Sequence, residues 1–438
     1  MDIMSQSVNQ ELIEFLDNSP TCFQAVENFR KMLKDAGYSE LLECEKWEIV
    51  PGGKYFVTRN DSSIIAFSVP KKDFTGFQLI CSHTDSPSFK IKENAEMDAD
   101  GKYTKLNVEG YGGMLCAPWF DRPLSVAGRV VIRQGDRLVS HLVNIDRDLL
   151  VIPGVAIHMD RSVNKGAELN PAVDLLPLLG CGKEPGAFRK LIAEAAGVRE
   201  EHLLSTELFL YPRTKAVQTG LNGEFIVSPR LDDLQCVFGC LEGFLAAKPG
   251  GSLPVLAVFN NEEVGSNTRQ GADSTFLTDV LERIAHGCGL DSEAWKAAVA
   301  NSFMVSADNA HAIHPAHPEY ADKGEFPVLG GGIVIKYNAN QRYTTDAVSG
   351  AVFQAICQEA GVPVQRYSNR ADLPGGSTLG NISTAHLSVP TVDIGLPQLA
   401  MHSVCETAGA ADTDYLVKAM TAYFSRDFHR DRDGGIVF

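Results

Sequence analysis

The stretch Pro254–Ser266, with the sequence PVLAVFNNEEVGS, places two adjacent glutamates close behind an apolar run. The first half of this stretch carries no charged side chain, which is typical of a strand buried on both faces of a sheet. Glu262 and Glu263 then lie where the chain leaves that strand. Two like charges side by side repel each other in a confined place, so a positive partner has to hold them there. The nature of this partner is the question that the sequence raises.

The composition describes an ordinary globular protein with an acidic charge balance. The chain has 438 residues, of which 44% are hydrophobic and 21% are charged, and its length favours two domains over a single core. The formal net charge is −16 at pH 7, and the Lys and Arg residues form no dense runs. Since nucleic acids and anionic membrane surfaces attract positive charge, we expect no nucleic acid and no membrane among the partners.

The N-terminus and the cysteines favour a cytoplasmic location. Residues 1–6 lack the basic and apolar segments of a signal peptide, and no apolar run approaches the length of a membrane-spanning helix. The ten cysteines are scattered, and the closest pair, Cys236 and Cys240, has no second pair to complete a zinc knuckle. We therefore expect reduced thiols rather than disulfides.

The apolar pattern predicts an α/β fold with a β-rich segment in its middle. The first forty residues are predicted to be helical, with Gly37 as a stop. Between about residues 94 and 217, short β-like pieces alternate with Gly and Pro turns, and a helix is predicted at 187–195. Elsewhere strands alternate with helices, which indicates a mixed, largely parallel sheet covered by helices on both faces. Strands are predicted at 54–58, 63–67, 77–81, 125–133, 254–259, 303–306, 332–336 and 390–394, and further helices at 231–247 and 413–424.

Side chains that bind metals follow several of the predicted strands. In open α/β sheets, ligands bind beyond the carboxyl ends of the strands, so groups in these positions are expected to meet. Two further carboxylates, Asp232 and Asp233, lie at a predicted helix start. The groups that follow strands are His83 and Asp85 after 77–81, Glu262 and Glu263 after 254–259, Asp308 after 303–306, and His402 after 390–394.

Each of these residues alone has an ordinary structural explanation. A single histidine such as His402 is more often a core or surface residue than a ligand. Asp232 alone could favour a helix N-terminus, and Asp308 could form a turn. Glu262 and Glu263 alone could lie in a solvated loop. Together, however, such groups are seldom placed at strand ends by chance. The mixed set of His and carboxylate ligands suits zinc, with cobalt or manganese as substitutes.

The charge count favours two metal ions over one. Two divalent ions bring four positive charges, while Asp232, Glu263 and Asp308 supply three negative charges and a bridging hydroxide supplies the fourth. One glutamate of the adjacent pair can then ligate a metal, while its neighbour stays free as the general base for a metal-activated water. The positive partner of the two glutamates is therefore predicted to be a pair of metal ions.

Taken in order, these residues resemble the aspartyl aminopeptidase family of two-zinc metallopeptidases. The match extends nearly end to end, and the combination of motifs is highly specific, although Glu-Glu-Val-Gly alone also occurs in related aminopeptidases of other substrate classes. The matching stretches are CSHTDSP at 81–87, SPRLDDL at 228–234, NEEVGS at 261–266, SADNAH at 306–311, KYNANQRY at 336–343, GGSTLG at 375–380 and MHS at 401–403.

The resemblance implies two Zn²⁺ ions per subunit and a role for each ligand. It selects Asp232 over Asp233 as the bridging carboxylate, a choice that spacing alone leaves open. The implied assignment is His83 and Asp308 on one ion, Glu263 and His402 on the other, Asp232 between them, Glu262 as the general base, and Asp85 as the support of His83.

The resemblance also implies a substrate class and an assembly. The family removes an N-terminal Asp or Glu from peptides, and the substrate carboxylate needs a positive partner. Lys336 is the first candidate for this partner and Arg342 the second, while a structural ion pair is the alternative role of Lys336. His158, in the stretch AIHMDR at 156–161, matches a family histidine that reaches into the active site of a neighbouring subunit. Family members form dimers that assemble into tetrahedral dodecamers.

The expected domain division and function follow from the same resemblance. A catalytic domain of residues 1–93 and 218–438 would carry a β-rich dimerisation domain, residues 94–217, as an insertion. The predicted function is hydrolysis of the peptide bond after an N-terminal Asp or Glu. The alternative is a two-metal aminopeptidase of broad or neutral specificity, which would differ only in the pocket around Lys336. A non-catalytic assembly that keeps the fold is less favoured, because Glu262 and every ligand are present.

Overall fold

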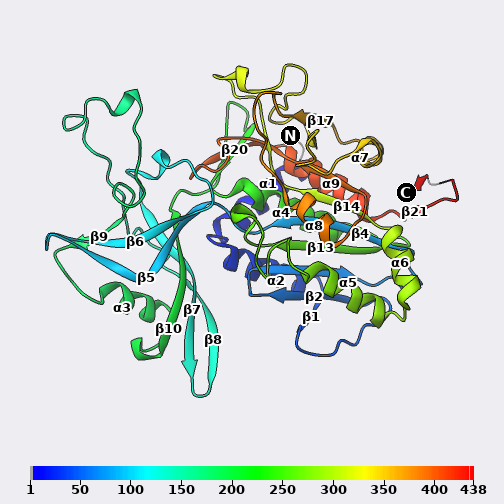
Figure 1. The fold of residues 1–438 in the computed structure, drawn as a ribbon, viewed down its shortest axis with the longest axis horizontal. Helices are drawn as coiled ribbons and strands as arrows, with labels where there is room; N and C mark the ends of the chain where they lie inside the picture. The colour runs from blue at the N-terminus through cyan, green and yellow to red at the C-terminus, as the bar shows by residue number, and fades with distance from the viewer. Residues whose placement is uncertain (1–2, 434) are drawn as a thin grey trace.

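A mixed sheet of nine strands forms the centre of the larger part of the molecule (Figure 1). The computed structural model describes residues 3–433 and 435–438. Five strand pairs of this sheet are parallel and three are antiparallel, so the predicted largely parallel sheet is confirmed. In spatial order the strands are β1 (Ser39–Leu41), β2 (Lys54–Arg59), β3 (Ser63–Ser68), β13 (Leu253–Phe259), β4 (Phe77–His83), β14 (Phe303–Ala307), β18 (Thr391–Gly395), β16 (Ile333–Tyr337) and β17 (Val364–Ser368).

The central strands are apolar throughout because both faces of the sheet are covered. Along β13, Val255 and Ala257 belong to one buried cluster, and Leu256 and Val258 belong to the other. None of these four side chains is more than 1% exposed. Since successive residues of a strand point to opposite faces, a strand covered on both sides needs an unbroken apolar run. This explains the first half of the stretch Pro254–Ser266.

Helices from distant parts of the chain cover each face. The helix pair α4 and α9 packs closely, because a Cβ atom at Gly243 of α4 would lie 2.4 Å from the Cβ atom of Met420 of α9. On this face lie α1 (Ile3–Asp17), α2 (Cys22–Asp35), α4 (Leu231–Ala246), α7 (Ala347–Glu359) and α9 (Asp412–Phe424). On the other face lie α5 (Phe276–Gly287), α6 (Ser292–Ala300) and α8 (Leu379–His386).

A second sheet, of six antiparallel strands, lies beside the first and has its own buried core (Figure 1). Its strands, in spatial order, are β8 (Arg137–Asn144), β7 (Leu124–Gln134), β10 (Leu203–Pro212), β5 (Ser88–Ala99), β6 (Tyr103–Tyr111) and β9 (Leu178–Cys181). Helix α3 (Ala187–Ala195) packs into this core through Phe188 and Ile192. The chain between β8 and β9 extends outward at the upper left of Figure 1.

A third sheet, of five short strands, was not predicted from the sequence and is important for the site. Three of its strands follow the central strands β14 and β18 in the chain, and the other two lie just before α4. Its strands, in spatial order, are β11 (Val217–Thr219), β12 (Phe225–Ser228), β20 (Glu406–Gly409), β19 (Pro397–Leu399) and β15 (Ala310–His311). The remaining elements are the pair β21 (His429–Arg430) and β22 (Ile436–Val437), and the 3₁₀ helices η1 (Ala117–Trp119), η2 (Val163–Lys165), η3 (Glu200–His202), η4 (Glu262–Val264) and η5 (Pro318–Tyr320).

The strands and helices that the pattern predicted are present, with ends that differ by one or two residues. The predicted strand at 77–81 extends to His83, and the predicted helix at 231–247 begins at Leu231 and ends at Ala246. The helix α2 ends at Asp35, and Gly37 follows with a φ of 83°, as expected of a glycine stop.

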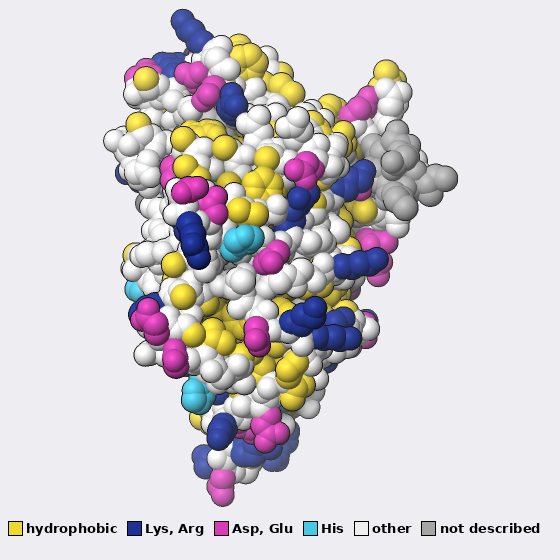
Figure 2. All heavy atoms as spheres, turned by 90° about the vertical axis from the view of Figure 1, so that its right-hand side faces the viewer, with side chains coloured by type: hydrophobic (Ala, Val, Ile, Leu, Met, Phe, Trp, Pro, Cys, Tyr) yellow, Lys and Arg dark blue, Asp and Glu magenta, His cyan; other side chains and the backbone are white. Residues whose placement is uncertain are grey.

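Charged side chains of both signs are mixed over the face of the molecule shown in Figure 2. In this view Lys and Arg side chains lie among Asp and Glu side chains, and hydrophobic patches separate them. Among the described residues, no helix has the length and apolar character needed to cross a membrane.

Candidate metal centre and active site

The carboxyl ends of four central strands meet at one edge of the nine-stranded sheet. The last residue of β4, His83, is paired in register with Phe259, the last residue of β13. On the other side of β4, Ser306 of β14 pairs with Cys81, so β14 ends at the same level. Ile394 of β18 pairs in turn with the last residue of β14. Groups that follow these strands are therefore brought together, as the sequence predicted.

The carboxylate of Asp232 lies at the centre of the cluster. Its Oδ1 atom is 3.5 Å from Nε2 of His83, and its Oδ2 atom is 3.5 Å from Nε2 of His402. The Nε2 atom of His402 also lies 3.3 Å from Oε2 of Glu263. Asp308 joins the group on the side of His83, and ligand atoms within each group lie at most 4.8 Å apart. One carboxylate thus faces two histidines with its two oxygens.

These separations fit a metal site better than they fit hydrogen bonds. A nitrogen and an oxygen bound about 2.0–2.1 Å from a tetrahedral zinc ion lie about 3.3–3.4 Å apart. The Asp232–His402 and Glu263–His402 distances of 3.5 and 3.3 Å are close to this separation. In addition, Oδ1 of Asp232 and Oε1 of Glu263 are buried without a hydrogen-bond donor among the described residues. A buried carboxylate oxygen without a donor is costly, and a cation would satisfy it. The residues present therefore fit divalent metal ions.

The electrostatics of the cluster also call for positive charge. Although burial alone would raise the pKa of Asp232, His402 and His83 hold it below its usual range. Burial, followed by the charge of Asp232, raises the pKa of Glu263 well above its usual range. Burial would lower the pKa of His83, but its carboxylate neighbours raise it overall. Carboxylates outnumber cationic side chains here, and cations in the cluster would offset their mutual repulsion.

Glu262 lies at the start of the short helix η4, next to but apart from the Asp232–Glu263–His402 group. Burial, followed by the charges of Asp308 and Asp85, raises the pKa of Glu262 to about 8. Its backbone N–H donates to Oδ1 of Asp85 over 3.2 Å, so Asp85 helps to fix the turn. A carboxyl group with a pKa near neutrality can both accept and release a proton at physiological pH.

Asp85 contacts His83 through its main chain as well as its side chain. The Nδ1 atom of His83 lies 3.1 Å from the carbonyl oxygen of Asp85 and 3.5 Å from Oδ1 of its carboxylate. The carboxylate also accepts the backbone N–H of Glu263 over 3.2 Å and the hydroxyl of Tyr111 over 2.6 Å. Asp85 therefore connects, through these hydrogen bonds, the segment after β4 to the segment after β13, both of which carry site residues.

Two further buried acidic residues, Glu406 and Asp233, to which the sequence analysis assigned no role of their own, hold backbone segments of the site in place. Glu406, which is 2% exposed, accepts the backbone N–H of Asp232 over 3.0 Å and that of His402 over 2.7 Å. Asp233 accepts the hydroxyl of Ser82 and the backbone N–H of His83 through Oδ2. Glu406 thus positions two segments of the cluster by their backbones, while Asp233 fixes the end of β4.

Lys336 is buried beside the metal cluster. Its Nζ atom donates to the carbonyl oxygen of Asn309 over 2.8 Å and lies 3.7 Å from Oδ1 of Asp308. The second candidate, Arg342, is exposed, and it does not line the cavity that adjoins the cluster. That cavity has a volume of about 190 Å³, and its lining includes His83, Asp232, Glu262, Asp308, His311, Lys336, Tyr343, Tyr367 and His402.

His158 lies away from this cavity within the chain. It is exposed on a turn of the long segment between β8 and β9, and it is not among the residues that line the cavity. The structure therefore brings together every predicted site residue except His158 and Arg342. The lining residues Tyr343 and Tyr367 were not predicted as site residues, although Tyr343 ends the matching stretch at 336–343; no such signal in the sequence marks Tyr367.

Comparisons with known proteins give one consistent result. The family model of Aminopeptidase I zinc metalloprotease (M18) matches residues 15–424. A probable M18 family aminopeptidase 2 of Clostridium acetobutylicum is 46% identical over 427 residues, which cover 95% of this chain and 98% of that protein. A protein of the same description from Pseudomonas aeruginosa (strain LESB58) is 42% identical over 430 residues, covering 96% of this chain and 99% of that one.

Solved structures agree with these sequences. The cryo-EM structure of the Ape4 and Nbr1 complex superimposes with a TM-score of 0.93 at 37% identity, covering 96% of this chain and 86% of that chain. The structure of the S. cerevisiae mApe1 dodecamer gives a TM-score of 0.85 at 26% identity, covering 96% of this chain and 97% of that one.

Proposed function

Because this chain belongs to the M18 family of zinc aminopeptidases, we propose that it hydrolyses the peptide bond after an N-terminal Asp or Glu. The observation that carries the proposal is the placement of the buried ammonium group of Lys336 in the lining of the cavity that adjoins the metal cluster. A positive group at that position provides a partner for a carboxylate on the first residue of the substrate.

We propose that the site holds two zinc ions. His83 and Asp308 would hold one ion and Glu263 and His402 the other, while Asp232, which faces both histidines, would bridge them. When bound, zinc lowers the pKa of a coordinated water and polarises the carbonyl group of the substrate. Cobalt or manganese has similar ligand preferences and is the expected substitute.

Glu262 is the proposed general base. Glu262 belongs to only one of the three groups of possible metal ligands, the one with His83 and Glu263, and it lines the cavity where the substrate would bind. It would take a proton from the attacking water and pass it to the leaving amine. Asp85 would hold the turn that carries Glu262 through the backbone hydrogen bond described above.

The pocket around Lys336 decides between the proposal and its alternative. Lys336 already donates to Asn309 and lies 3.7 Å from Asp308, so part of its charge is used within the protein. A lysine used only in this structural way would be consistent with the broad or neutral specificity. For the acidic specificity, Lys336 has to keep a donor free for the substrate, and an ammonium group has three donors.

We further propose that the six-stranded sheet belongs to a dimerisation domain, residues 94–217, inserted between the two parts of the catalytic domain, 1–93 and 218–438. The separate buried core of this sheet supports the division, although β5 begins at Ser88 and its Phe89 and Ile91, which precede residue 94, belong to the same core. His158, exposed on its outer segment, would reach the active site of a neighbouring subunit in a tetrahedral dodecamer. The mApe1 relative, whose structure is a dodecamer, supports such an assembly. A cytoplasmic location is supported by the ten cysteines, all of which are free.

The test is hydrolysis of matched Asp-, Glu- and Leu-capped amide substrates by the zinc-loaded protein and by Lys336→Met. We expect the wild type to cleave the two acidic substrates at least about tenfold faster than the Leu substrate, since a charge-assisted hydrogen bond contributes about 1.5–3 kcal/mol. Lys336→Met should lose this preference and keep Leu cleavage. Equal or faster cleavage of Leu by the wild type would establish the broad specificity instead.

A further inference from the structure

A tyrosine of the six-stranded sheet reaches the cluster of the nine-stranded sheet. Tyr111 is the last residue of β6, and its hydroxyl donates to Oδ2 of Asp85 over 2.6 Å. The same hydroxyl accepts a hydrogen bond from Nδ2 of Asn261 over 2.8 Å. Tyr111 therefore contacts both chain segments that leave β4 and β13 toward the metal ligands.

Asn261 is the residue at which the chain turns into the two glutamates. It has a φ of 62°, in the left-handed region that a non-glycine residue adopts only when its surroundings hold it there. Its side-chain oxygen accepts hydrogen bonds from Thr268 over 2.9 Å and from Gln270 over 2.8 Å. Through its amide nitrogen, this turn is also fixed to Tyr111.

The hydroxyl of Tyr111 makes the shortest hydrogen bond to the carboxylate of Asp85 within the described part of the chain. The backbone N–H groups of Glu262 and Glu263 donate to it over 3.2 Å each, and Nδ1 of His83 lies 3.5 Å from its Oδ1 atom. A short hydrogen bond that a hydroxyl donates to a carboxylate is stronger than a longer one donated by a backbone N–H. Removing the hydroxyl would leave Oδ2 of Asp85 with the weaker of its two contacts.

We propose that Tyr111 is a positioning residue of the metal centre, acting through Asp85 and Asn261 on His83 and on the Glu262–Glu263 turn. The six-stranded sheet then contributes to the metal site of its own chain, in addition to any role in assembly. The inference rests on the proposed metal centre but is independent of the proposed acidic specificity.

The surroundings of Tyr111 allow its hydroxyl to be removed without disturbing the packing. Its ring packs edge-on against Phe209 of β10, with ring centroids 5.5 Å apart. Tyr111 and Asp85 both line a cavity of about 80 Å³ between the two sheets. Since one ordered water needs roughly 10–15 Å³, water from this cavity can replace part of the lost hydrogen bond. The substitution Tyr111→Phe is therefore expected to fold and to weaken the site partially.

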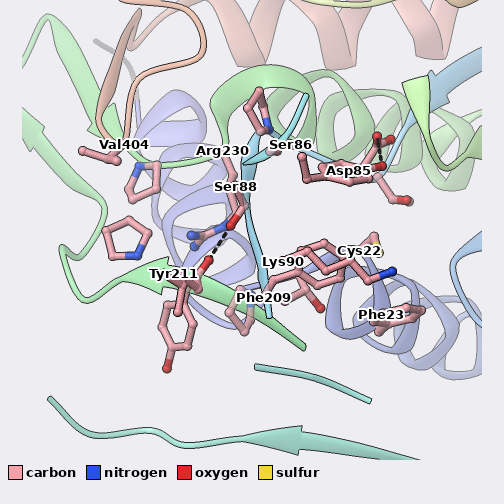
Figure 3. Close-up of a pocket in the computed structure, with 18 of the residues that line it drawn as sticks. Cys22, Phe23, Asp85, Ser86, Ser88, Lys90, Phe209, Tyr211, Arg230 and Val404 are labelled. Carbon is pink, nitrogen blue, oxygen red and sulfur yellow. Dashed lines mark hydrogen bonds between the residues drawn. The ribbon is translucent and has the colours of Figure 1, made fainter. Parts of the chain in front are cut away.

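The same cavity supplies a matched control. Tyr211 of β10 also lines it, but its hydroxyl donates to Oδ1 of Asn144 over 2.7 Å. Figure 3 shows Tyr211 on the opposite side of the cavity from Asp85. The hydroxyl of Tyr211 also accepts a hydrogen bond from Nη1 of Arg213 over 3.1 Å, so Tyr211→Phe removes one donated and one accepted hydrogen bond, as Tyr111→Phe does, without touching the metal cluster.

The first measurement is the zinc affinity of the wild type, Tyr111→Phe and Tyr211→Phe by competition with a chromophoric chelator. Loss of a group that orients metal ligands typically costs 10- to 100-fold in affinity, so we expect about a tenfold loss in Tyr111→Phe and less than a twofold change in Tyr211→Phe. We also expect a lower kcat with KM within twofold, and a fall in the melting temperature of the metal-free protein no larger than that of Tyr211→Phe. Equal zinc affinity in all three proteins, or a fall in metal-free stability that matches the fall in affinity, would overturn the proposal.

A double-mutant cycle tests whether the effect passes through Asp85. If it does, Asp85→Ala and the double variant with Tyr111→Phe should have the same zinc affinity within about twofold, because the two residues act as a unit. Additive losses would show that Tyr111 does not act through Asp85, and would overturn the part of the proposal that concerns His83. If the wild type itself bound no zinc, the proposed metal centre would fail, whereas normal zinc binding by Tyr111→Phe would refute only this inference.

Discussion

In the nine-stranded sheet, the centres of the strands carry apolar side chains, whereas their carboxyl ends carry buried charged ones. In the centre of β4, Leu79 and Ile80 are fully buried among apolar side chains of both faces. A few residues later, His83 lies among carboxylates, and Asp232 and Glu263 carry buried oxygens without donors in the described chain. The centre is stable by its own packing, while the end is complete only with cations.

This difference separates what stabilises the fold from what performs the chemistry. Burial of apolar surface stabilises the centre whether or not a ligand is present. At the strand ends, buried carboxylates oppose folding until a metal offsets their charge. Substitutions at the two places should therefore change different measurable quantities.

The largest expected effect is on turnover, at a strand end. Glu262→Gln keeps the shape of the side chain but removes the base, and general acid–base catalysis contributes about 10²- to 10⁴-fold to a rate. We expect kcat to fall by about that factor, with zinc content and melting temperature close to those of the wild type. Steady-state kinetics and metal analysis of the same preparation check this. Full activity in Glu262→Gln would show that another group is the base.

Removal of the metal should change stability through the same strand ends. A ligand present at about 1,000 times its Kd stabilises the folded protein by about 4 kcal/mol, so chelation should lower the free energy of unfolding by about that amount. Denaturant titrations with and without chelator measure the loss. In Asp232→Asn, which lacks the charge that faces both histidines, chelation should have little effect. An equal loss in both proteins would place the stabilising metal elsewhere.

A smaller effect is expected at the strand centres, and on stability alone. The hydroxyl of Tyr423, which is fully buried, donates to the carbonyl oxygen of Phe303 over 2.7 Å and accepts the N–H of Leu79 over 3.1 Å. Tyr423→Phe removes this hydrogen-bond partner from both backbone groups, which should lower the free energy of unfolding by about 1–3 kcal/mol. The kcat of the folded protein should not change.

Tyr103→Phe provides the control for that experiment, because Tyr103 is 46% exposed. It should cost less than about 0.5 kcal/mol. If Tyr423→Phe lowered kcat as strongly as it lowered stability, the separation between strand centres and strand ends would be wrong.

The sequence predicted the nine-stranded sheet well because its central strands are buried on both faces. The run in β13 contains no polar residue, and such an unbroken apolar run is needed only in a strand that is covered on both faces. The five-stranded sheet could not be predicted, because strands as short as Ala310–His311 carry no periodicity. Their pairing is set by long-range contacts with β19 and β20.

The ligand positions were predictable for the same reason, since they follow strands whose ends are visible in the sequence. His83, Glu263 and Asp308 all lie within four residues of such an end. Glu406 could not be found, because it acts on the backbone N–H groups of Asp232 and His402, and a sequence does not show which backbones meet. The hydrogen bonds of Tyr111 could not be predicted either, because they connect residues of two different sheets that are far apart in the sequence.

The smallest expected effect concerns a buried carboxylate outside the metal cluster. Asp412, at the start of α9, is fully buried and accepts the N–H groups of Gly330 over 2.8 Å and Gly332 over 3.0 Å. Burial raises the pKa of Asp412 to about 7. Between the ordinary pKa of an aspartate, about 3.9, and this value, the folded state binds more protons than the unfolded state, so stability falls as the pH rises.

Asp412→Asn has no charge to titrate and should lose this part of the pH dependence, although one of its two acceptor oxygens is gone. The stability of the wild type relative to the variant should fall by roughly 1 kcal/mol per pH unit between pH 5 and 7, and level off above pH 7. Denaturant unfolding of the two metal-free proteins at each pH measures the difference in stability. The metal ligands titrate in the same way in both proteins, so their contribution cancels. A difference in stability that stays constant over this pH range would mean that the two glycine N–H groups keep Asp412 ionised in the folded protein. Burial of an ionised carboxylate without a cation would then cost less free energy here than at the strand ends.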